Sequence, residues 1–277
     1  MRLLNTIRAA ALATAAVVAA APLAIETVSA GTLDEIKARG SLRVGMSAAY
    51  KPFEFVEGEQ IVGLDPDIIQ IIADELGVTA ELIDTNWAGV VPSLYANKFD
   101  IIISAMTGTP ERAERVLFTQ PYGEQTFYFL TQADRAAETA KDFDGLTVSA
   151  EGGGAAQTGI EKWVADGHIT FKDQVYLSNP NEAYLAVKVG RADAAVDGLP
   201  GLMAFMQTNP GFKLVKGFGP DQVMIMAIRK EDKDLCEAVD AVITKIKADG
   251  RLAAIQEKWF GQTMPAGDTL PDYLGSN

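Results

Sequence analysis

Apolar residues along this chain follow two patterns, one with helical spacing and one of short continuous runs. Residues 66–76 carry isoleucine and leucine at helical spacing, and Gly77 follows as a stop signal. The runs at 101–103 and 194–196 are wholly apolar, which is typical of strands buried on both faces of a parallel sheet. Because segments of the two kinds alternate, the pattern predicts an α/β fold with mostly parallel sheets.

Capping residues set the expected helix starts. Thr32 with Glu35 reads as a capping box, and Asp65 reads as the N-cap of a helix with Pro66 in its first position. Thr109 and Asn179 also precede prolines and predict helices in the same way. The expected helices are 32–39, 65–76, 87–96, one from 110, one ending near 164, one from 180, 233–248 and 251–259, and the expected strands are 42–45, 80–83, 100–104, 146–150, 175–177, 194–196, 212–215 and 223–228.

The N-terminus has the pattern of a secretory signal peptide. Arg2 and Arg8 precede an apolar stretch over residues 9–24, and Val28-Ser29-Ala30 fits cleavage after Ala30. A membrane anchor is the alternative, but the apolar stretch is shorter than the ~20 residues that span a bilayer. We therefore expect an exported protein, which is periplasmic in a bacterium with two membranes.

Composition and charge exclude several classes of function. The chain has 277 residues, 48% of them hydrophobic, which is ample for one or two buried cores. A formal net charge of −13 is opposite to that of a sequence-independent nucleic-acid binder. One cysteine and one histidine rule out a Cys/His zinc site and a disulfide framework. No cofactor or metal is expected.

Two segments resemble each other within the chain. Residues 93–104 and 182–196 each contain a helical stretch, a basic residue, an aspartate (Asp100 or Asp193) and an apolar strand. Either the similarity is chance, or two similar lobes are present. In the second case the carboxyl ends of their strands can face one cleft, which is where ligands bind in open α/β sheets.

The residues from Ser104 to Arg112 form the first candidate site. A buried strand ends at Ser104 and a helix begins after Thr109, so hydroxyl groups, free N–H groups and a helix start lie together. Arg112 in the first turn can form a bidentate pair with a carboxylate. The alternative is that Arg112 pairs with a surface acid, but the spacing from Glu111 and Glu114 is poor for that. We expect an anion site here.

Two aromatic residues also follow predicted strands. Tyr50 lies in the loop after the first strand, and Trp87 follows the strand at 80–83. Both can therefore reach one cleft mouth, where they would form the walls of a ligand slot. Packing in the core is the alternative for both.

A series of short motifs covers essentially the whole chain after residue 30. The motifs are weak alone but strong in their order and spacing. Together they resemble the polar amino-acid family, family 3, of periplasmic solute-binding proteins of ABC transporters. The residues that carry the resemblance are Leu42-Arg43-Val44-Gly45, Tyr50 to Phe55, Val62 to Asp65, Asp67-Ile68, Trp87, Pro92, Leu94, Asp100, Thr107 to Arg112, Phe118 to Tyr122, Asp144-Gly145, Gly190 to Ala194 and Gly250-Arg251-Leu252.

The resemblance implies a two-lobed periplasmic-binding-protein fold of type II. Two crossing strands, near 122–126 and 217–224, would join lobe 1 (31–123 and 222–277) to lobe 2 (124–221). A small ligand would bind between the lobes, and the closed form would dock, as a monomer, on membrane permease subunits. The family's ligand positions fall on Ser47, Tyr50, Trp87, Ser104, Ala105, Thr107 and Arg112 in lobe 1 and on Glu151, Gly154, Ala155 and Ala156 in lobe 2.

Two departures from the family pattern bear on the ligand. Gly154, Ala155 and Ala156 offer only backbone groups where the family has a hydroxyl. The aspartate that binds the ligand's ammonium would fall on Gly198, and Asp197 comes one residue early. Either a bulge brings Asp197 into that role, or Glu151 takes it, or the ligand is not an ordinary α-amino acid.

Charge matching gives a hypothesis for the ligand. Arg112 needs one anionic group and an α-ammonium needs one acid. If Glu151 and Asp197 both face the slot, one acid remains for a cationic or strongly polar side chain. We therefore expect a polar amino acid, basic ones included, or a related zwitterion; if Glu151 points to solvent, the extra acid is lost.

An enzyme on the same scaffold is the competing hypothesis. Cyclohexadienyl and arogenate dehydratases share the fold and use a carboxyl group in the pocket as the acid catalyst. Glu151 could serve in this way if burial raised its pKa. The sequence favours a binding protein that is not an enzyme.

Overall fold

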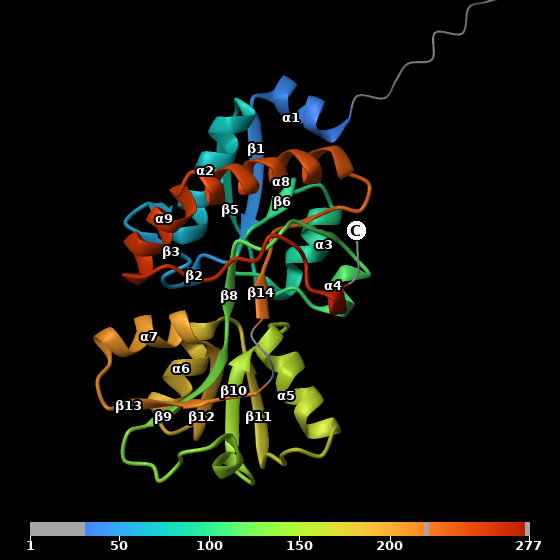
Figure 1. The fold of residues 1–277 in the computed structure, drawn as a ribbon. Coiled ribbons are helices and arrows are strands. Elements are labelled where there is room, and N and C mark those ends of the chain that lie inside the picture. The colour runs from blue at the N-terminus through green and yellow to red at the C-terminus, as the bar shows by residue number, and fades with distance from the viewer. Residues whose placement is uncertain (1–30, 219–221, 275–277) are drawn as a thin grey trace, which may run out of the picture.

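The computed structural model describes residues 31–218 and 222–274. It consists of two lobes, one above the other, each built on its own five-stranded sheet (Figure 1). Lobe 1 is the part around the sheet that contains β1, and lobe 2 is the part around the sheet that contains β10. The predicted signal peptide, residues 1–30, lies outside the described residues.

The sheet of lobe 1 has the strand order β5-β1-β6-β15-β7. β5, β1 and β6 are parallel, whereas β15 is antiparallel to both of its neighbours. The predicted strand 223–228 is thus wrong in one respect, because it divides into two short strands in different sheets. The strands are β1 (Ser41–Met46), β5 (Thr79–Asp84), β6 (Ile101–Ile102), β7 (Leu117–Phe118) and β15 (Ala227–Ile228), and a small sheet beside them holds β2 (Ala49–Tyr50), β3 (Glu54–Glu57) and β4 (Gln60–Val62).

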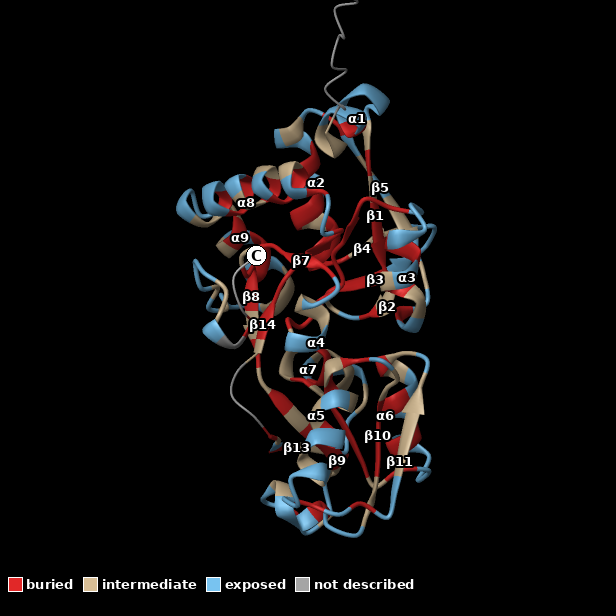
Figure 2. Ribbon diagram, turned by 90° about the vertical axis from the view of Figure 1, so that its right-hand side faces the viewer, coloured by how far each residue is buried: buried red, intermediate tan, exposed pale blue. Residues whose placement is uncertain are grey.

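Helices cover both faces of this sheet because successive residues of its central strands point to opposite sides. Ile101 and Ile103 pack with the helices on one face, and Ile102 packs with those on the other. Both faces are consequently buried, and the exposed residues lie on the outer sides of the helices (Figure 2). The helices of lobe 1 are α1 (Thr32–Arg39), α2 (Leu64–Leu76), η1 (Trp87–Gly89), α3 (Val90–Tyr95), α4 (Pro110–Ala113), α8 (Lys233–Ala248), α9 (Arg251–Phe260) and η3 (Asp272–Leu274).

Lobe 2 repeats this plan with the order β11-β10-β12-β9-β13. β11, β10 and β12 are parallel, and β9 runs antiparallel to β12 and β13. One core lies between the sheet and α5, and another lies between the sheet and the pair α6 and α7. The elements are β9 (Phe127–Gln132), η2 (Ala140–Phe143), β10 (Thr147–Glu151), α5 (Ala155–Ala165), β11 (Asp173–Leu177), α6 (Pro180–Lys188), β12 (Ala194–Gly198), α7 (Leu199–Thr208) and β13 (Phe212–Lys216).

Two antiparallel strands lie between the lobes. They are β8 (Gly123–Gln125) and β14 (Gln222–Met224), which pair over their full length (Figure 1). β8 leads almost directly into β9 of lobe 2, and β14 leads into β15 of lobe 1. Residues 219–221, within the second predicted crossing, are outside the described part. No helix of the described residues is both long and apolar enough to cross a bilayer.

The capping predictions have mixed outcomes. The Thr109 side chain accepts a hydrogen bond from Arg112 N at 3.3 Å, and Asn179 accepts one from Glu182 N at 3.0 Å, so both caps are confirmed. The capping box at Thr32 is wrong, because its hydroxyl donates instead to Asp232 at 2.5 Å. The cap at Asp65 is also wrong, because α2 begins at Leu64 and its N-cap is Gly63.

The two similar segments found in the sequence occupy matching places in the two lobes. Asp100 Oδ2 accepts a hydrogen bond from Arg43 N of β1 at 2.9 Å, and its Oδ1 pairs with the Arg43 guanidinium. Asp193 Oδ2 accepts a bond from Thr147 N of β10 at 2.9 Å, and its Oδ1 pairs with Arg135. Each aspartate thus joins the start of one strand to the next strand of its sheet, so the lobes are built alike.

Candidate ligand-binding site between the lobes

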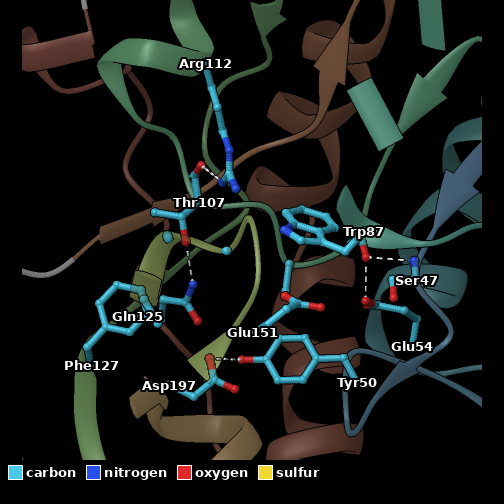
Figure 3. Close-up of a pocket in the computed structure, with 15 residues that line it drawn as sticks. Ser47, Tyr50, Glu54, Trp87, Thr107, Arg112, Gln125, Phe127, Glu151 and Asp197 are labelled. Atoms are coloured by element: carbon cyan, nitrogen blue, oxygen red, sulfur yellow. Dashed lines mark hydrogen bonds between the residues drawn. The ribbon is translucent and has the colours of Figure 1, made fainter. Parts of the chain in front are cut away.

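The carboxyl ends of the parallel strands in both lobes face one cavity of about 40 Å³ between the lobes (Figure 3). Every residue that the sequence predicted for the site lines this cavity. Three further residues line it that sequence reasoning missed: Glu54, Gln125 and Phe127. The predicted residues are Ser47, Tyr50, Trp87, Ser104, Ala105, Thr107, Arg112, Glu151, Gly154, Ala155, Ala156 and Asp197.

The loop after β6 is held in a single conformation by hydrogen bonds. Ser104 Oγ accepts a bond from Ser47 N at 3.1 Å and donates one to Glu54 Oε1 at 2.6 Å. Ala105 has a φ of 43°, a left-handed conformation that is uncommon for a residue other than glycine. Gln125 Nε2 donates to Thr107 Oγ1 at 2.7 Å. Hydrogen bonds within the protein therefore position this loop.

Arg112 faces the cavity from the first turn of α4. Its Nη1 donates to Thr107 O at 2.7 Å, its Nη2 donates to Gly153 O at 3.0 Å, and its guanidinium lies 5.2 Å from the centre of the Trp87 ring. Burial lowers the Arg112 pKa to about 10, so the group stays charged at neutral pH. Its two hydrogen bonds leave three of the five N–H donors of an arginine for another partner.

No carboxylate of the described residues forms an ion pair with Arg112. The aspartates and glutamates that do pair with arginine or lysine lie elsewhere on the two lobes. A half-buried cation without an anion attracts one more strongly than a fully exposed cation does, because less water screens it. The helix contributes less than the sequence suggested, since α4 has only four residues. The guanidinium itself is therefore the main attraction for an anion.

The aromatic walls of the cavity also join the lobes. Trp87 and Tyr50 are 7% and 9% exposed, and each donates a hydrogen bond to lobe 2. Trp87 Nε1 donates to Gly153 O at 3.0 Å, and Tyr50 Oη donates to Asp197 Oδ1 at 3.1 Å. A third bond, from Asn181 Nδ2 to Ala49 O at 2.6 Å, lies outside the cavity. The structure is thus a closed arrangement of the two lobes.

Asp197 is a fixed acid at one end of the cavity. It lies in β12, which pairs with β9 in an unbroken register, so the bulge considered from the sequence is absent from this strand. The side chain reaches the cavity nevertheless, and it accepts hydrogen bonds from Tyr50, from Tyr184 and from Gly198 N. Burial raises the Asp197 pKa to about 6, although these three bonds favour the charged form.

Glu151 is a second acid in the cavity and has a different environment. Its side chain lines the cavity from the end of β10 and makes no hydrogen bond to the described residues. Burial and the neighbouring charge of Asp197 raise its pKa well above the usual range, and Arg112 offsets part of this effect. The alternative that Glu151 points to solvent is therefore wrong. A carboxylate that lines this cavity and accepts no hydrogen bond from a described residue favours a cationic partner.

The missed residues show what the sequence could not reveal. Glu54 lies in the Pro52-Phe53-Glu54-Phe55 motif, which supported the family resemblance, but Glu54 was not expected to contact the ligand. Gln125 and Phe127 lie on either side of the end of β8, and they reach the cavity only because that strand passes directly between the lobes. Their position depends on how the lobes meet, for which no local sequence signal exists.

Comparison with known proteins agrees with this geometry. Residues 42–262 match the sequence pattern of the family described as bacterial extracellular solute-binding proteins, family 3. The chain is 31% identical over 266 residues to the L-cystine-binding protein TcyJ of Escherichia coli, which covers 94% of this chain and 98% of that protein. It is 31% identical over 251 residues to ABC transporter arginine-binding protein 1 of E. coli, covering 88% of this chain and 98% of that one.

A solved structure shares the two-lobed fold. The crystal structure of the ancestral amino acid-binding protein AncCDT-1, described as a precursor of cyclohexadienyl dehydratase, superposes with a TM-score of 0.75 and 34% sequence identity. The similarity covers 83% of this chain and all of that one. The predicted type II periplasmic-binding-protein fold is thereby confirmed.

Proposed function

Since this chain belongs to family 3 of the bacterial extracellular solute-binding proteins, we propose that it captures a basic amino acid and delivers it to the permease subunits of an ABC importer. One arrangement carries the proposal: Arg112, which has no ion pair with a described residue, lines the same cavity as three acids. One of them, Glu54, accepts a hydrogen bond from Ser104, which leaves Glu151 and Asp197 for the ligand. Arg112 complements a carboxylate, and the acids Glu151 and Asp197 complement two cationic groups. A basic amino acid carries this set of charges.

We assign the carboxylate of the ligand to lobe 1. The free N–H groups of Arg112 supply a charge-assisted bond, and the ordered loop from Ser104 to Thr107 supplies polar groups beside it. Trp87, which already packs beside Arg112, covers the same side of the cavity. Lobe 1 thus holds the part that all amino acids share.

The two acids divide the cationic groups between them. Asp197 is oriented by Tyr50, Tyr184 and Gly198 N, so it suits the α-ammonium, whose position is the same in every amino acid. No described residue donates a hydrogen bond to the Glu151 carboxyl group, so this side chain is free to adapt to the side-chain cation of the ligand. Gly154, Ala155 and Ala156, at the start of α5, add backbone groups.

Closure of the lobes completes the site. A ligand docks on lobe 1, and lobe 2 then adds Glu151, Asp197 and the start of α5, so the closed state is favoured by the contacts made only in it. We assign residues 31–123 and 222–277 to lobe 1 and 124–221 to lobe 2, with β8 and β14 as the hinge. The hydrogen bonds from Trp87 and Arg112 to Gly153 support closure about that hinge.

The same proposal covers location and partners. Removal of residues 1–30 after Ala30 would release the chain as a monomer into the periplasm, where the closed form meets the permease. The membership in an extracellular family supports the export. Mass spectrometry of the secreted protein tests the cleavage site, since the mature N-terminus should be Gly31.

We infer binding rather than catalysis for this site. The two curated relatives above are named as binding proteins, and the superposed structure is that of an ancestral amino acid-binding protein. Incubation with prephenate and with arogenate tests the dehydratase alternative. An aromatic product that disappears in Glu151→Gln would establish the enzyme instead.

Calorimetry with a panel of amino acids tests the ligand class. The panel contains L-arginine, L-lysine, L-histidine, L-cystine, L-glutamine and L-glutamate. Basic amino acids should bind more tightly than glutamine, and glutamate should bind most weakly because it brings a negative charge to two acids. Tight binding of glutamate without binding of any cationic amino acid would contradict the proposal.

A further inference from the structure

Two buried carboxyl groups lie together behind the ligand loop. Glu54 comes from β3 and Asp65 from the first turn of α2, and both are 0% exposed. Asp65 is the residue that the sequence placed at a helix cap, yet it faces the interior of lobe 1. Burial of two acids side by side needs a physical explanation, because an isolated buried carboxylate is very costly.

Nearby donors satisfy only one oxygen of each carboxyl group. Glu54 Oε1 accepts a bond from Ser104 Oγ at 2.6 Å. Asp65 Oδ2 accepts bonds from Ala105 N at 2.6 Å and from Tyr122 Oη at 3.2 Å. Glu54 Oε2 and Asp65 Oδ1 are buried and receive no bond from an N–H or O–H group of the described residues. Neither group forms an ion pair with a described lysine, arginine or histidine.

The two carboxyl groups are close enough to interact directly, and each has one buried oxygen that no N–H or O–H group of the described residues satisfies. Ionised carboxylates are acceptors only and repel each other, whereas a proton held between the two groups would provide the missing donor. We propose that Glu54 and Asp65 share one proton at neutral pH, and that the resulting pair positions Ser104 and Ala105 for the ligand. Its role in ligand binding rests on the function proposed above, whereas the shared proton does not.

The pair can position the loop because each carboxyl group holds one of its residues. Glu54 accepts the hydrogen bond that the Ser104 hydroxyl donates, which leaves the hydroxyl oxygen free to accept one from Ser47 N. Asp65 holds the N–H of Ala105, whose left-handed φ of 43° needs such support. A change in the pair would therefore move the cavity wall beside Thr107.

The charged surroundings of the pair favour retention of the proton. The titratable groups that face it are Tyr122, Tyr50 and Glu151, none of which carries a positive charge. Burial raises the Glu54 pKa well above its usual range, as does the neighbouring Asp65, and burial raises the Asp65 pKa to about 7. Burial also raises the Tyr122 pKa, so its hydroxyl remains a donor.

Stability should change with pH in a defined direction. The folded pKa values lie above those of unfolded carboxyl groups, so the folded state binds more protons over the interval between them. The stabilising contribution is complete below the unfolded values and is lost as the pH rises through the folded ones. Loss of the shared proton leaves two adjacent charges behind the loop, so ligand affinity should also fall at alkaline pH.

The test begins with infrared spectroscopy of the ligand-free protein. The difference spectrum of wild type minus Glu54→Gln at pH 7 should contain the C=O band of a protonated carboxyl group. Glu57→Gln is the matched control, because Glu57 lies on the same strand but is exposed and should give no such band. A Glu54 difference spectrum without the band overturns the shared proton whether or not any amino acid binds.

Calorimetry with L-arginine from pH 6 to pH 9 then tests the positioning role. Glutamine at position 54 retains an acceptor for Ser104 and a donor for Asp65, so E54Q should show a smaller alkaline decline in affinity than wild type and E57Q. The decline that remains in E54Q comes from the ligand's own ammonium group. Glu54→Leu, which supplies neither group, should bind at least about tenfold more weakly than E54Q. An alkaline decline in E54Q equal to that of wild type contradicts the proposal.

A stability measurement keeps the test decisive if E54L does not fold. Urea unfolding of wild type between pH 5 and pH 9 should show a loss of stability with rising pH, and E54Q should show a smaller loss. Equal pH dependence in the two proteins, again with E57Q as the reference, contradicts the proposal.

Discussion

Replacement of Arg112 by alanine is the sharpest test of how lobe 1 holds its ligand. The guanidinium is half-buried, carries no ion pair to a described residue and has N–H groups to spare beside the loop, and a bound ligand between the closed lobes would bury it further. Breaking a buried pair between such a group and a carboxylate costs about 3–5 kcal/mol. At 1.4 kcal/mol for each tenfold change, the affinity should fall roughly 100- to 4,000-fold.

The loss must be separated from the contacts that Arg112 makes without ligand. Its bond to Gly153 O joins the lobes, so the substitution also weakens the closed state itself. Calorimetry of R112A with L-arginine and with agmatine, which is arginine without its carboxylate, makes the distinction. The part of the affinity loss that comes from the ligand's carboxylate should appear with arginine and be absent with agmatine, whereas the part that comes from weaker closure should appear with both.

The control is the neighbouring arginine on the exposed surface. Arg115→Ala should bind L-arginine as the wild type does, because the Arg115 side chain lies outside the cavity. In the wild type, agmatine should bind much more weakly than arginine, and in R112A the difference should shrink. The reasoning is refuted if R112A binds L-arginine within threefold of wild type, or if it discriminates between arginine and agmatine as well as wild type does.

Three further predictions follow from the same geometry. Glu151→Gln should reduce the preference for L-arginine over L-glutamine, whereas Asp197→Asn should weaken both by a similar factor; calorimetry that shows the reverse pattern would exchange the two roles. The Asp197 pKa is about 6 in the free protein, and a bound cation favours the charged form of this group, so affinity for L-arginine should fall by up to about tenfold per pH unit below pH 6. Binding near pH 6 should also release protons, which calorimetry in buffers of different ionisation enthalpy detects. Affinity that rises on acidification would contradict this. Gly45→Ala should destabilise lobe 1 by about 1–3 kcal/mol in urea unfolding, because a Cβ there would lie 2.5 Å from the Phe99 ring. Gly89→Ala should stay near wild type, because a Cβ there would meet no atom of the described residues within 4 Å; equal effects would be inconsistent with this packing.

Local sequence signals predicted those parts of the fold that depend on local interactions. Thr109 and Asn179 cap their helices as expected because the cap and its N–H partner are three residues apart. Thr32 and Asp65 failed for the opposite reason. The hydroxyl of Thr32 binds Asp232, and Asp65 binds Ala105, so a partner distant in sequence replaced the local one.

Elements without a clear periodicity were missed. The helix α7 (Leu199–Thr208) contains apolar residues with little alternation. The strand β9 comes directly after the expected crossing strand at 122–126, with only Thr126 between β8 and β9. The position of β9 depends on pairing with β12 and β13, which lie more than 60 residues further along the chain. Such long-range pairing leaves no signal in a short window of sequence.

The candidate site was predicted more fully than the fold around it. Its residues follow strands, and the carboxyl ends of parallel strands meet at one edge of a sheet, so Tyr50, Trp87 and Arg112 could be placed together in advance. The resemblance to a known family added the start of α5 and the acids of lobe 2. The pairing of Glu54 with Asp65 could not be foreseen, because it needs β3 and α2 to meet behind the loop.

A crystal structure of the protein with L-arginine tests the central claim most directly. The account predicts the ligand between the lobes, with its carboxylate on Arg112 and its two cationic groups on Asp197 and Glu151. A ligand that sits elsewhere, or one whose carboxylate lies away from the Arg112 guanidinium, would contradict it.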